Sequence, residues 1–169
     1  MTERIAIIGV GNMGRAIADR LDNHYDLNLS DSSQTNQSAI KKSDVVILCV
    51  KPQMFASVAQ EMGDTCTGRL VISIMAGIRL ATISQTLGDL AIVRCMPNLG
   101  LKHGESMTGW IANNLVNPTQ REFVRNLFNL WGKELEVNDE DKIDKLSAIS
   151  GSGPAYFFYM AEAMQSAAE

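Results

Sequence analysis

The hydrophobic positions of this chain alternate between short continuous runs and helical repeats. The first run, residues 5–8, is entirely apolar and rich in isoleucine, which predicts a short buried strand. Met13, Ile17 and Leu21 then recur at helical spacing, so we expect a helix shortly after the strand. Alternation of apolar and polar residues predicts a strand at residues 25–30, and further apolar runs predict strands at 45–50, 70–74 and 91–93.

The alternation of strands with helices indicates the fold class. Helical spacing predicts short helices within residues 34–42, 55–62 and 80–87, between the predicted strands. The run at 45–50 is continuously apolar, which is typical of a parallel strand buried on both faces. The order of elements therefore predicts an α/β fold with a doubly wound, mainly parallel sheet.

Beyond residue 98 the hydrophobic pattern is less regular. We expect strands at residues 106–112 and 134–137, a helix that opens at Pro118, and another helix at 139–149. The last helix, residues 155–168, is apolar on nearly every side and therefore needs burial on several sides. We expect another subunit to cover it and partner helices to be missing from this sequence. The alternative is a terminal helix that leaves one apolar face exposed.

Three glycines follow the first strand in the spacing G-x-G-x-x-G, where the first helix begins. Gly9 permits a tight turn, Gly11 allows a pyrophosphate to approach the backbone, and Gly14 allows helix and strand to pack closely. The free N–H groups at the helix start would face the phosphates. A strand, a glycine turn and a helix in this order predict a Rossmann-like dinucleotide-binding domain. The alternative is a glycine-rich turn that binds no ligand.

Two charged residues follow later strands at places where a dinucleotide would lie. Asp31 stands about 20 residues beyond the glycine turn, where an acidic residue accepts the 2′-hydroxyl of NAD and an arginine favours NADP. Asp31 is equally consistent with a helix cap or a turn. Lys51 ends the third predicted strand, at the edge where ligands bind in such sheets. It is either a cofactor contact or an exposed lysine.

Composition narrows the classes of function. The chain has 169 residues and a formal net charge of −4, and Lys41-Lys42 is its longest basic run, so we expect no nucleic-acid-binding surface. No apolar segment is long enough to cross a bilayer, and the first residues predict a strand, not a signal peptide. Cys49, Cys66 and Cys95 are odd in number and lack the spacing of metal ligands. Cys49 and Cys95 lie in apolar strand patterns, so we expect small buried hydrophobic side chains, not redox groups, and a cytoplasmic protein.

Six segments, taken in order, carry a resemblance to a known family. They are Ile7-Ile8-Gly9-Val10-Gly11-Asn12-Met13-Gly14, Ser43-Asp44-Val45-Val46, Val50-Lys51-Pro52, Ala76-Gly77-Ile78, Val93-Arg94-Cys95-Met96-Pro97-Asn98 and Ser150-Gly151-Ser152-Gly153-Pro154-Ala155-Tyr156. The last of them is the most distinctive. On these segments the whole chain resembles pyrroline-5-carboxylate reductase. The resemblance implies an oxidoreductase that uses NAD(P)H to reduce 1-pyrroline-5-carboxylate to L-proline, the last step of proline biosynthesis.

The resemblance also implies a domain organisation. Residues 1–138 would form the dinucleotide-binding domain, and residues 139–169 would begin a helical domain for dimerisation and substrate binding. Family members are longer, so we expect this chain to be a fragment that binds the cofactor with little or no turnover. The full-length protein would be a homodimer or a higher homo-oligomer, and the main carboxylate-binding segment would lie in the missing part.

Site residues follow from the resemblance position by position. The pyrophosphate would lie on Gly9, Val10, Gly11, Asn12, Met13 and Gly14, and the adenosine near Ser30, Asp31 and Asn36. The nicotinamide side would be lined by Cys49, Val50, Lys51, Pro52, Met75, Ala76 and Gly77. The substrate, a cyclic imine carboxylate, would lie near Pro97, Asn98, Ser150, Gly151, Ser152, Gly153 and Glu162. His24 and His103 stand isolated in apparent turns, and we interpret them as surface residues. The catalytic residues are therefore unknown, and we name no general acid.

Two departures from the family leave alternatives open. The link between the second and third predicted strands is short and lacks the basic residue that often lies beside a 2′-phosphate. The cofactor is therefore NADP(H) or NAD(H), with NADP favoured by the resemblance alone. Asn98 is followed by Leu99-Gly100-Leu101, where the family usually has Thr-Pro-Ala. The other hypotheses are a different imine or hydroxyacid reductase of the same fold, and a catalytically silent NAD(P)-binding protein.

Overall fold

A computed structural model describes residues 3–31 and 36–168, and within these residues seven strands form one sheet in the order β2-β1-β3-β4-β5-β6-β7. The strands β1 to β5 run parallel, β6 runs antiparallel to β5, and β7 runs parallel to β6. The strands are β1 (Arg4–Ile8), β2 (Asp26–Ser30), β3 (Val45–Leu48), β4 (Leu70–Ser73), β5 (Ala91–Met96), β6 (Ser106–Ala112) and β7 (Gly132–Glu136). The predicted mainly parallel sheet is confirmed.

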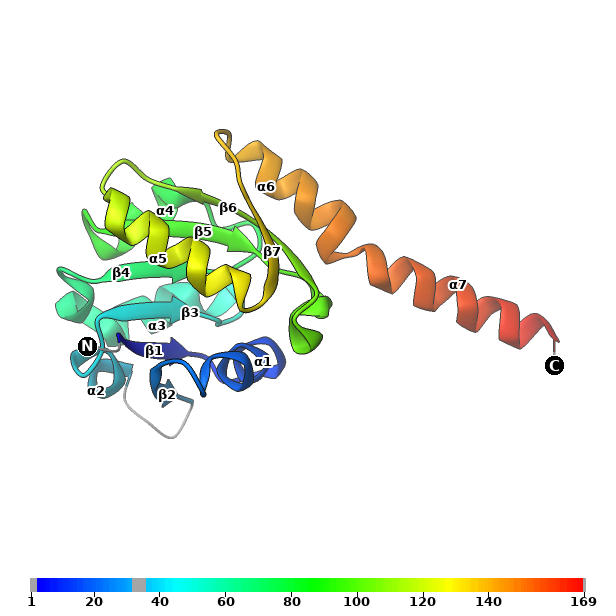
Figure 1. Ribbon diagram of the computed structural model, residues 1–169, viewed down its shortest axis with the longest axis horizontal. Coiled ribbons are helices and arrows are strands. Elements are labelled where there is room, and N and C mark those ends of the chain that lie inside the picture. The colour runs from blue at the N-terminus through cyan, green and yellow to red at the C-terminus, as the bar shows by residue number, and fades with distance from the viewer. Residues whose placement is uncertain (1–2, 32–35, 169) are drawn as a thin grey trace.

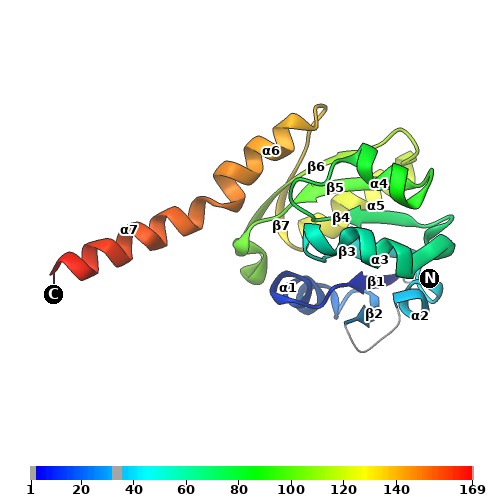
Figure 2. The same cartoon turned by 180° about the vertical axis from the view of Figure 1, so that it is seen from behind.

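Helices cover both faces of this sheet. α1 (Asn12–Leu21) and α5 (Pro118–Asn129) pack on one face, and α2 (Asn36–Lys41), α3 (Phe55–Met62) and α4 (Leu80–Leu87) pack on the other. Figure 1 is viewed from the side of α5, and Figure 2 brings α3 and α4 to the front. The arrangement is the doubly wound one that the sequence predicts.

The side chains of β1 contribute to both layers of the core. Ile5 and Ile7 pack with α1 and α5, whereas Ala6 and Ile8 pack with the helices of the opposite face. Successive side chains of a strand point to opposite faces, so a strand that is covered on both sides must be apolar throughout. This requirement explains the continuous apolar run at the start of the sequence.

The strand β1 lies where the direction of winding reverses. The chain passes from β1 through α1 to β2 on one side, and then crosses to β3 on the other side of β1. In such sheets ligands bind at the carboxyl ends of the strands, next to this reversal. The glycine turn follows the carboxyl end of β1, so the fold puts the motif where a ligand would bind.

Among the strands, the largest difference between a predicted and an observed end is in β5. The predicted strand ends at Val93, but β5 continues through Arg94 to Met96 because these residues pair with β6. The guanidinium of Arg94 is fully buried, and its charge is met by Glu140 and Asp144. A hydrophobic pattern cannot anticipate a buried arginine whose partners lie about 50 residues away in the chain. In the other direction, β3 ends at Leu48, before the predicted end at residue 50.

The C-terminal helices leave the sheet. α6 (Asp141–Leu146) is followed by a π-helical segment, η4 (Ser147–Gly151), and by α7 (Gly153–Ala168). Figure 1 shows α7, coloured orange to red, extending away from the sheet. Its large apolar side chains are between 54% and 76% exposed: Tyr156, Phe157, Phe158, Tyr159, Met160 and Met164. The apolar character of this helix on several sides is confirmed, and its cover by another subunit stays a prediction.

Candidate functional site

The three glycines of the turn between β1 and α1 occupy three different environments. Gly9 has a φ of +96°, which favours glycine, and its N–H donates to the carbonyl of Ser30 at 3.0 Å. A Cβ on Gly14 would stand 2.0 Å from the carbonyl oxygen of Gly9, so helix and turn pack in direct contact. A Cβ on Gly11 would meet no atom within 4 Å. The three environments match the tight turn, the close packing and the open approach that the motif predicts.

The start of α1 is open to an anion. Gly11 is the N-cap residue and provides no side-chain cap, so the first N–H groups of the helix keep their capacity to donate hydrogen bonds. Arg15 and Lys102 line a cavity of about 410 Å³ on this side of the turn, together with Asn12 next to Gly11 and one acidic residue, Asp19. The bare backbone, the helix start and the two cations therefore fit a pyrophosphate.

A cavity of about 550 Å³ opens beside the same turn, at the carboxyl ends of β1, β2 and β3. Ile8, Met54, Val58 and Glu61 contribute to its lining. Most residues predicted to bind the cofactor also line this cavity: Gly9, Val10, Gly11, Ser30, Asp31, Asn36, Cys49, Val50 and Lys51. Segments that are far apart in the sequence thus form one concave surface, as a dinucleotide site requires.

The other residues predicted for the cofactor lie around this cavity or behind it. Met13 packs against the core, and Pro52 opens a short 3-10 helix, η1 (Pro52–Met54). The side chain of Met75 is buried among the residues beneath α3 and α4, so only its backbone remains for a ligand. Ala76 and Gly77 are exposed after the end of β4.

A hydrogen-bonded chain of three side chains closes the end of the cavity next to β2. Ser30 Oγ donates to Asn36 Oδ1 at 2.7 Å, and Asn36 Nδ2 donates to Glu61 Oε2 at 2.8 Å. Ser30 and Asn36 are buried, so the position of the Glu61 carboxylate is fixed from the protein interior. Sequence analysis missed Glu61, because the contact joins α3 to α2 and leaves no trace in local spacing.

The three cysteines are free thiols within the described residues, and burial raises the pKa of each one. Cys49 follows β3 at the cavity, and burial raises its pKa well above the ordinary range. Burial raises the pKa of Cys66 to about 11, although nearby Arg69 lowers it in part. Cys95 is buried, as expected from its strand, whereas Cys49, for which we expected the same, is only partly buried; Cys66 is buried as well. The environments of all three favour the protonated thiol.

We expect the folded protein to resist alkylation by iodoacetamide at about pH 8, because the thiolate is the reactive form. The fold favours the protonated thiol, so the contribution of Cys66 to stability is complete below its unfolded pKa of 9.0 and is lost as pH rises through about 11. Mass spectrometry of native and urea-denatured samples checks the labelling. Denatured protein should take up three labels, one for each cysteine. Rapid labelling of the native protein would contradict the prediction.

Two segments predicted for the substrate meet at the end of β5. Asn98 Nδ2 donates to Ser150 Oγ at 2.8 Å, although 52 residues separate them. Gly151 lies close to the side chain of Met96, and Pro97, which follows Met96, is buried. The carboxyl end of β5 is at the same edge of the sheet as the glycine turn, since β1, β3, β4 and β5 are parallel.

The remaining residues predicted for the substrate belong to the C-terminal helix. Ser152 precedes α7, and Gly153 is its first residue. Glu162 is exposed farther along α7, roughly 14 Å beyond Gly153 at the usual helical rise. α7 extends away from the sheet in Figure 2, so a single chain does not bring Glu162 to Asn98. The role of Glu162 stays a prediction.

Arg94 links the sheet to the C-terminal helices. Its guanidinium is 0% exposed and lies 2.9 Å from Glu140 Oε1 and 2.5 Å from Asp144 Oδ1. Glu140 Oε1 also accepts the N–H of Leu80 at 2.8 Å. At the surface of the same cluster, Arg79 pairs with Asp144 at 3.3 Å. The cluster holds α6 against the end of β5, beside Asn98, and the sequence pattern gave no signal for it.

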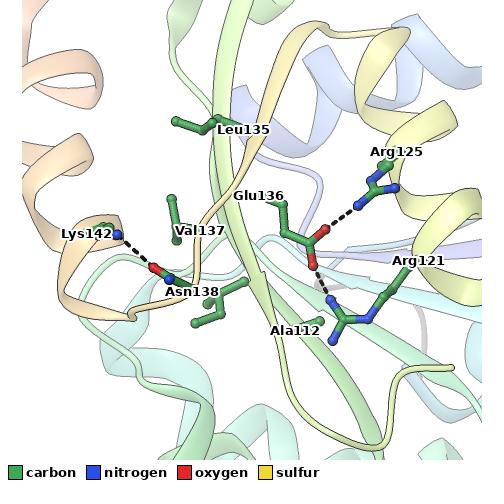
Figure 3. A pocket seen from close by; sticks show the side chains of 9 residues that line it. Ala112, Arg121, Arg125, Leu135, Glu136, Val137, Asn138 and Lys142 are labelled. Carbon is green, nitrogen blue, oxygen red and sulfur yellow. Dashed lines mark hydrogen bonds and ion pairs between the residues drawn. The ribbon is translucent and has the colours of Figure 1, made fainter. Parts of the chain in front are cut away.

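Another cavity, of about 790 Å³, lies elsewhere, on β6, β7 and α5. Figure 3 shows Arg121 and Arg125 both paired with Glu136, and Lys142 donating to Asn138. β7 is the edge strand opposite β2, so this cavity is remote from the glycine turn. Its polar groups largely satisfy one another, and we assign no ligand to it.

Several features bear on other classes of function. No helix in residues 3–31 and 36–168 combines the length and the apolarity that a membrane crossing needs. In the same residues, no group of three or more His, Cys, Asp or Glu side chains is placed to hold a metal ion. His24 and His103 are exposed, in agreement with their interpretation as surface residues.

Comparisons with known proteins add independent findings. A family model described as pyrroline-5-carboxylate reductase dimerisation matches residues 140–169, and one described as NADP oxidoreductase coenzyme F420-dependent matches residues 23–77. Pyrroline-5-carboxylate reductase of Pseudomonas aeruginosa is 35% identical over 190 residues, which cover 99% of this chain and 70% of the relative. The enzyme of Pasteurella multocida is 40% identical over 144 residues, which cover 83% of this chain and 52% of the relative.

A solved structure has the same fold. Plasmodium falciparum pyrroline carboxylate reductase with NADP bound has a TM-score of 0.87 and 28% identity. The match covers 98% of this chain and 69% of that one. This chain therefore spans between 52% and 70% of the length of these three proteins.

Proposed function

We propose that this chain, which belongs to the pyrroline-5-carboxylate reductase family, binds a reduced nicotinamide dinucleotide and serves the reduction of 1-pyrroline-5-carboxylate to L-proline. The observation that carries the proposal is the location of two sites at the same edge of the sheet. The glycine turn and its cavity occupy the ends of β1, β2 and β3, and the Asn98–Ser150 pair occupies the end of β5. A dinucleotide and a small substrate need adjacent sites of this kind.

Each part of the site has a proposed role that follows from its chemistry. The N–H groups after Gly11 bind the pyrophosphate, and Asp31 with the Ser30–Asn36 pair binds the adenosine ribose. The segments after β3 and β4 form the floor for the nicotinamide ring, and Asn98 with Ser150 orients the substrate. The bound cofactor would supply a hydride from the nicotinamide C4 to the C=N carbon of the imine.

The division of the chain into domains is part of the proposal. We assign residues 1–138 to the dinucleotide-binding domain and residues 139–169 to the start of a helical domain. The match of residues 140–169 to the dimerisation family supports this boundary. The exposed apolar side chains of α7 support association with a second copy of the chain, because large apolar patches of this kind mark interaction surfaces.

Cofactor titration tests the proposal. NADH and NADPH are added separately to the chain, and binding is followed by nicotinamide fluorescence and by calorimetry. We expect saturable binding of at least one of them in a 1:1 ratio. In parallel, NAD(P)H oxidation and proline formation are measured with 1-pyrroline-5-carboxylate, for this chain and for a version that extends to the length of the relatives.

The outcomes separate the hypotheses. Failure of both cofactors to bind removes the proposal altogether. Binding without turnover in the extended version supports a catalytically silent protein. Turnover of another cyclic imine or of a hydroxyacid, without turnover of 1-pyrroline-5-carboxylate, identifies a different reductase of the same fold.

A further inference from the structure

We infer that Glu61, together with Asp31, makes this chain select NADH over NADPH. The inference rests on the proposed function, because it takes the cavity beside the glycine turn as the dinucleotide site. It goes further by naming a specificity residue on α3 and the cofactor that this residue favours.

The first support is the fixed position of the Glu61 carboxylate. Glu61 lies at the cavity and accepts a hydrogen bond from Asn36 Nδ2 at 2.8 Å. Asn36 is held in turn by the hydroxyl of Ser30, whose side chain is fully buried at the end of β2. Two buried side chains thus hold the Glu61 carboxylate in place, whereas the side chain of an unpaired surface glutamate would be mobile.

The second support is the place of this chain of hydrogen bonds in the fold. In doubly wound sheets the adenosine ribose lies at the carboxyl end of the second strand, about 20 residues beyond the glycine turn. Ser30 ends β2, Asp31 follows it, and both line the cavity with Glu61. The 2′ position of the ribose would therefore meet two carboxylates.

The third support is the distribution of positive charge. Among the described residues that line the cavity, Lys51 is the one cation. It follows β3, which lies on the opposite side of β1 from β2, so it is placed away from the ribose end. Lys41 ends α2, at the opposite end of the helix from Asn36. The sequence between Asp31 and Asn36 is Ser-Ser-Gln-Thr and adds no charge.

These charges act differently on the two cofactors. The 2′-hydroxyl of NADH is a donor and can give its hydrogen to a carboxylate. The 2′-phosphate of NADPH carries close to two negative charges and offers mainly acceptors, so it is repelled by the same groups. NADP is bound in the solved structure of the Plasmodium falciparum relative, and the inference marks a difference in this chain.

The test is the ratio of two dissociation constants. NADH and NADPH are titrated by calorimetry into the wild-type chain and into Glu61→Gln, Asp31→Asn and the double variant. Glutamine keeps an oxygen that can accept from Asn36, so Glu61→Gln removes the charge and retains the contact. We expect the wild type to bind NADH at least tenfold more tightly, and each single variant to reduce the ratio about threefold or more.

Controls separate a local effect from a change in total charge. Asp89→Asn removes the same charge from an exposed residue before β5, at the amino ends of the parallel strands, and should leave the ratio unchanged. Thermal melting of each variant checks that the fold is intact. Raising the salt from about 0.05 M to about 0.5 M should reduce the wild-type preference, because salt screens exposed charges.

The result that overturns the inference is distinct from failure of the proposed function. NADPH binding as tight as NADH binding in the wild type removes the inference and leaves cofactor binding in place. An unchanged ratio in Glu61→Gln removes the role of Glu61. Binding of neither cofactor removes the proposed function itself.

Discussion

Gly14→Ala is expected to destabilise the protein by at least about 3 kcal/mol and to lower the yield of folded chain. The added Cβ would stand 2.0 Å from the carbonyl oxygen of Gly9 and 3.3 Å from the Cβ of Cys49. Backbone cannot move aside as a flexible side chain does, so α1 would have to separate from the turn. Urea denaturation followed by circular dichroism measures the loss.

Gly11→Ala is the matched control, because it adds the same methyl group at a position without packing contacts. No atom lies within 4 Å of the new Cβ. The φ of −77° at Gly11 suits alanine, and the cost in stability should stay below about 1 kcal/mol, as alanine is a poorer N-cap than glycine. Cofactor affinity should nevertheless fall at least tenfold, because the methyl group occupies the proposed path of the pyrophosphate. Equal stability of the two variants would refute the packing role of Gly14, and unchanged affinity in Gly11→Ala would refute the binding role of Gly11.

Arg94→Met is expected to destabilise the protein by about 3 kcal/mol and to release α6 from the sheet. The guanidinium is 0% exposed, and its removal leaves Glu140, which is 18% exposed, without its cationic partner. Methionine retains much of the stem volume, so the loss would reflect charge pairing more than a cavity. Denaturant melts measure the global effect, and hydrogen exchange in residues 141–146 measures the release of α6.

Arg79→Met provides the comparison within the same cluster. Arg79 also pairs with Asp144, but its side chain is 52% exposed, and exposed pairs contribute little to stability. We expect the melting temperature of Arg79→Met to stay close to that of the wild type. Any small difference between the two melting temperatures should shrink with added salt. A loss as large as that of Arg94→Met would show that burial of the guanidinium is not what makes Arg94 important.

The sequence predicted well those elements whose formation depends on residues that are close together in the chain. The apolar run before Gly9 and the helical repeat after it follow from burial on both faces of a sheet and on one side of a helix. The roles of Gly9 and Gly14 were also readable, because a positive φ and a contact with the adjacent turn involve neighbours in the chain. The continuous apolar surface of α7 was equally visible in its composition.

What the sequence by itself determined is therefore the order of strands and helices, the glycine turn and the resemblance to a family. Only the tertiary structure decided that Asn36 holds Glu61, that Asn98 meets Ser150, and that the charge of Arg94 is buried in a strand. Each of these contacts joins segments separated by 25 to 52 residues. Hydrophobic periodicity records which face of an element is buried, but it holds no information on which polar side chains meet across elements, because that depends on how the elements pack together.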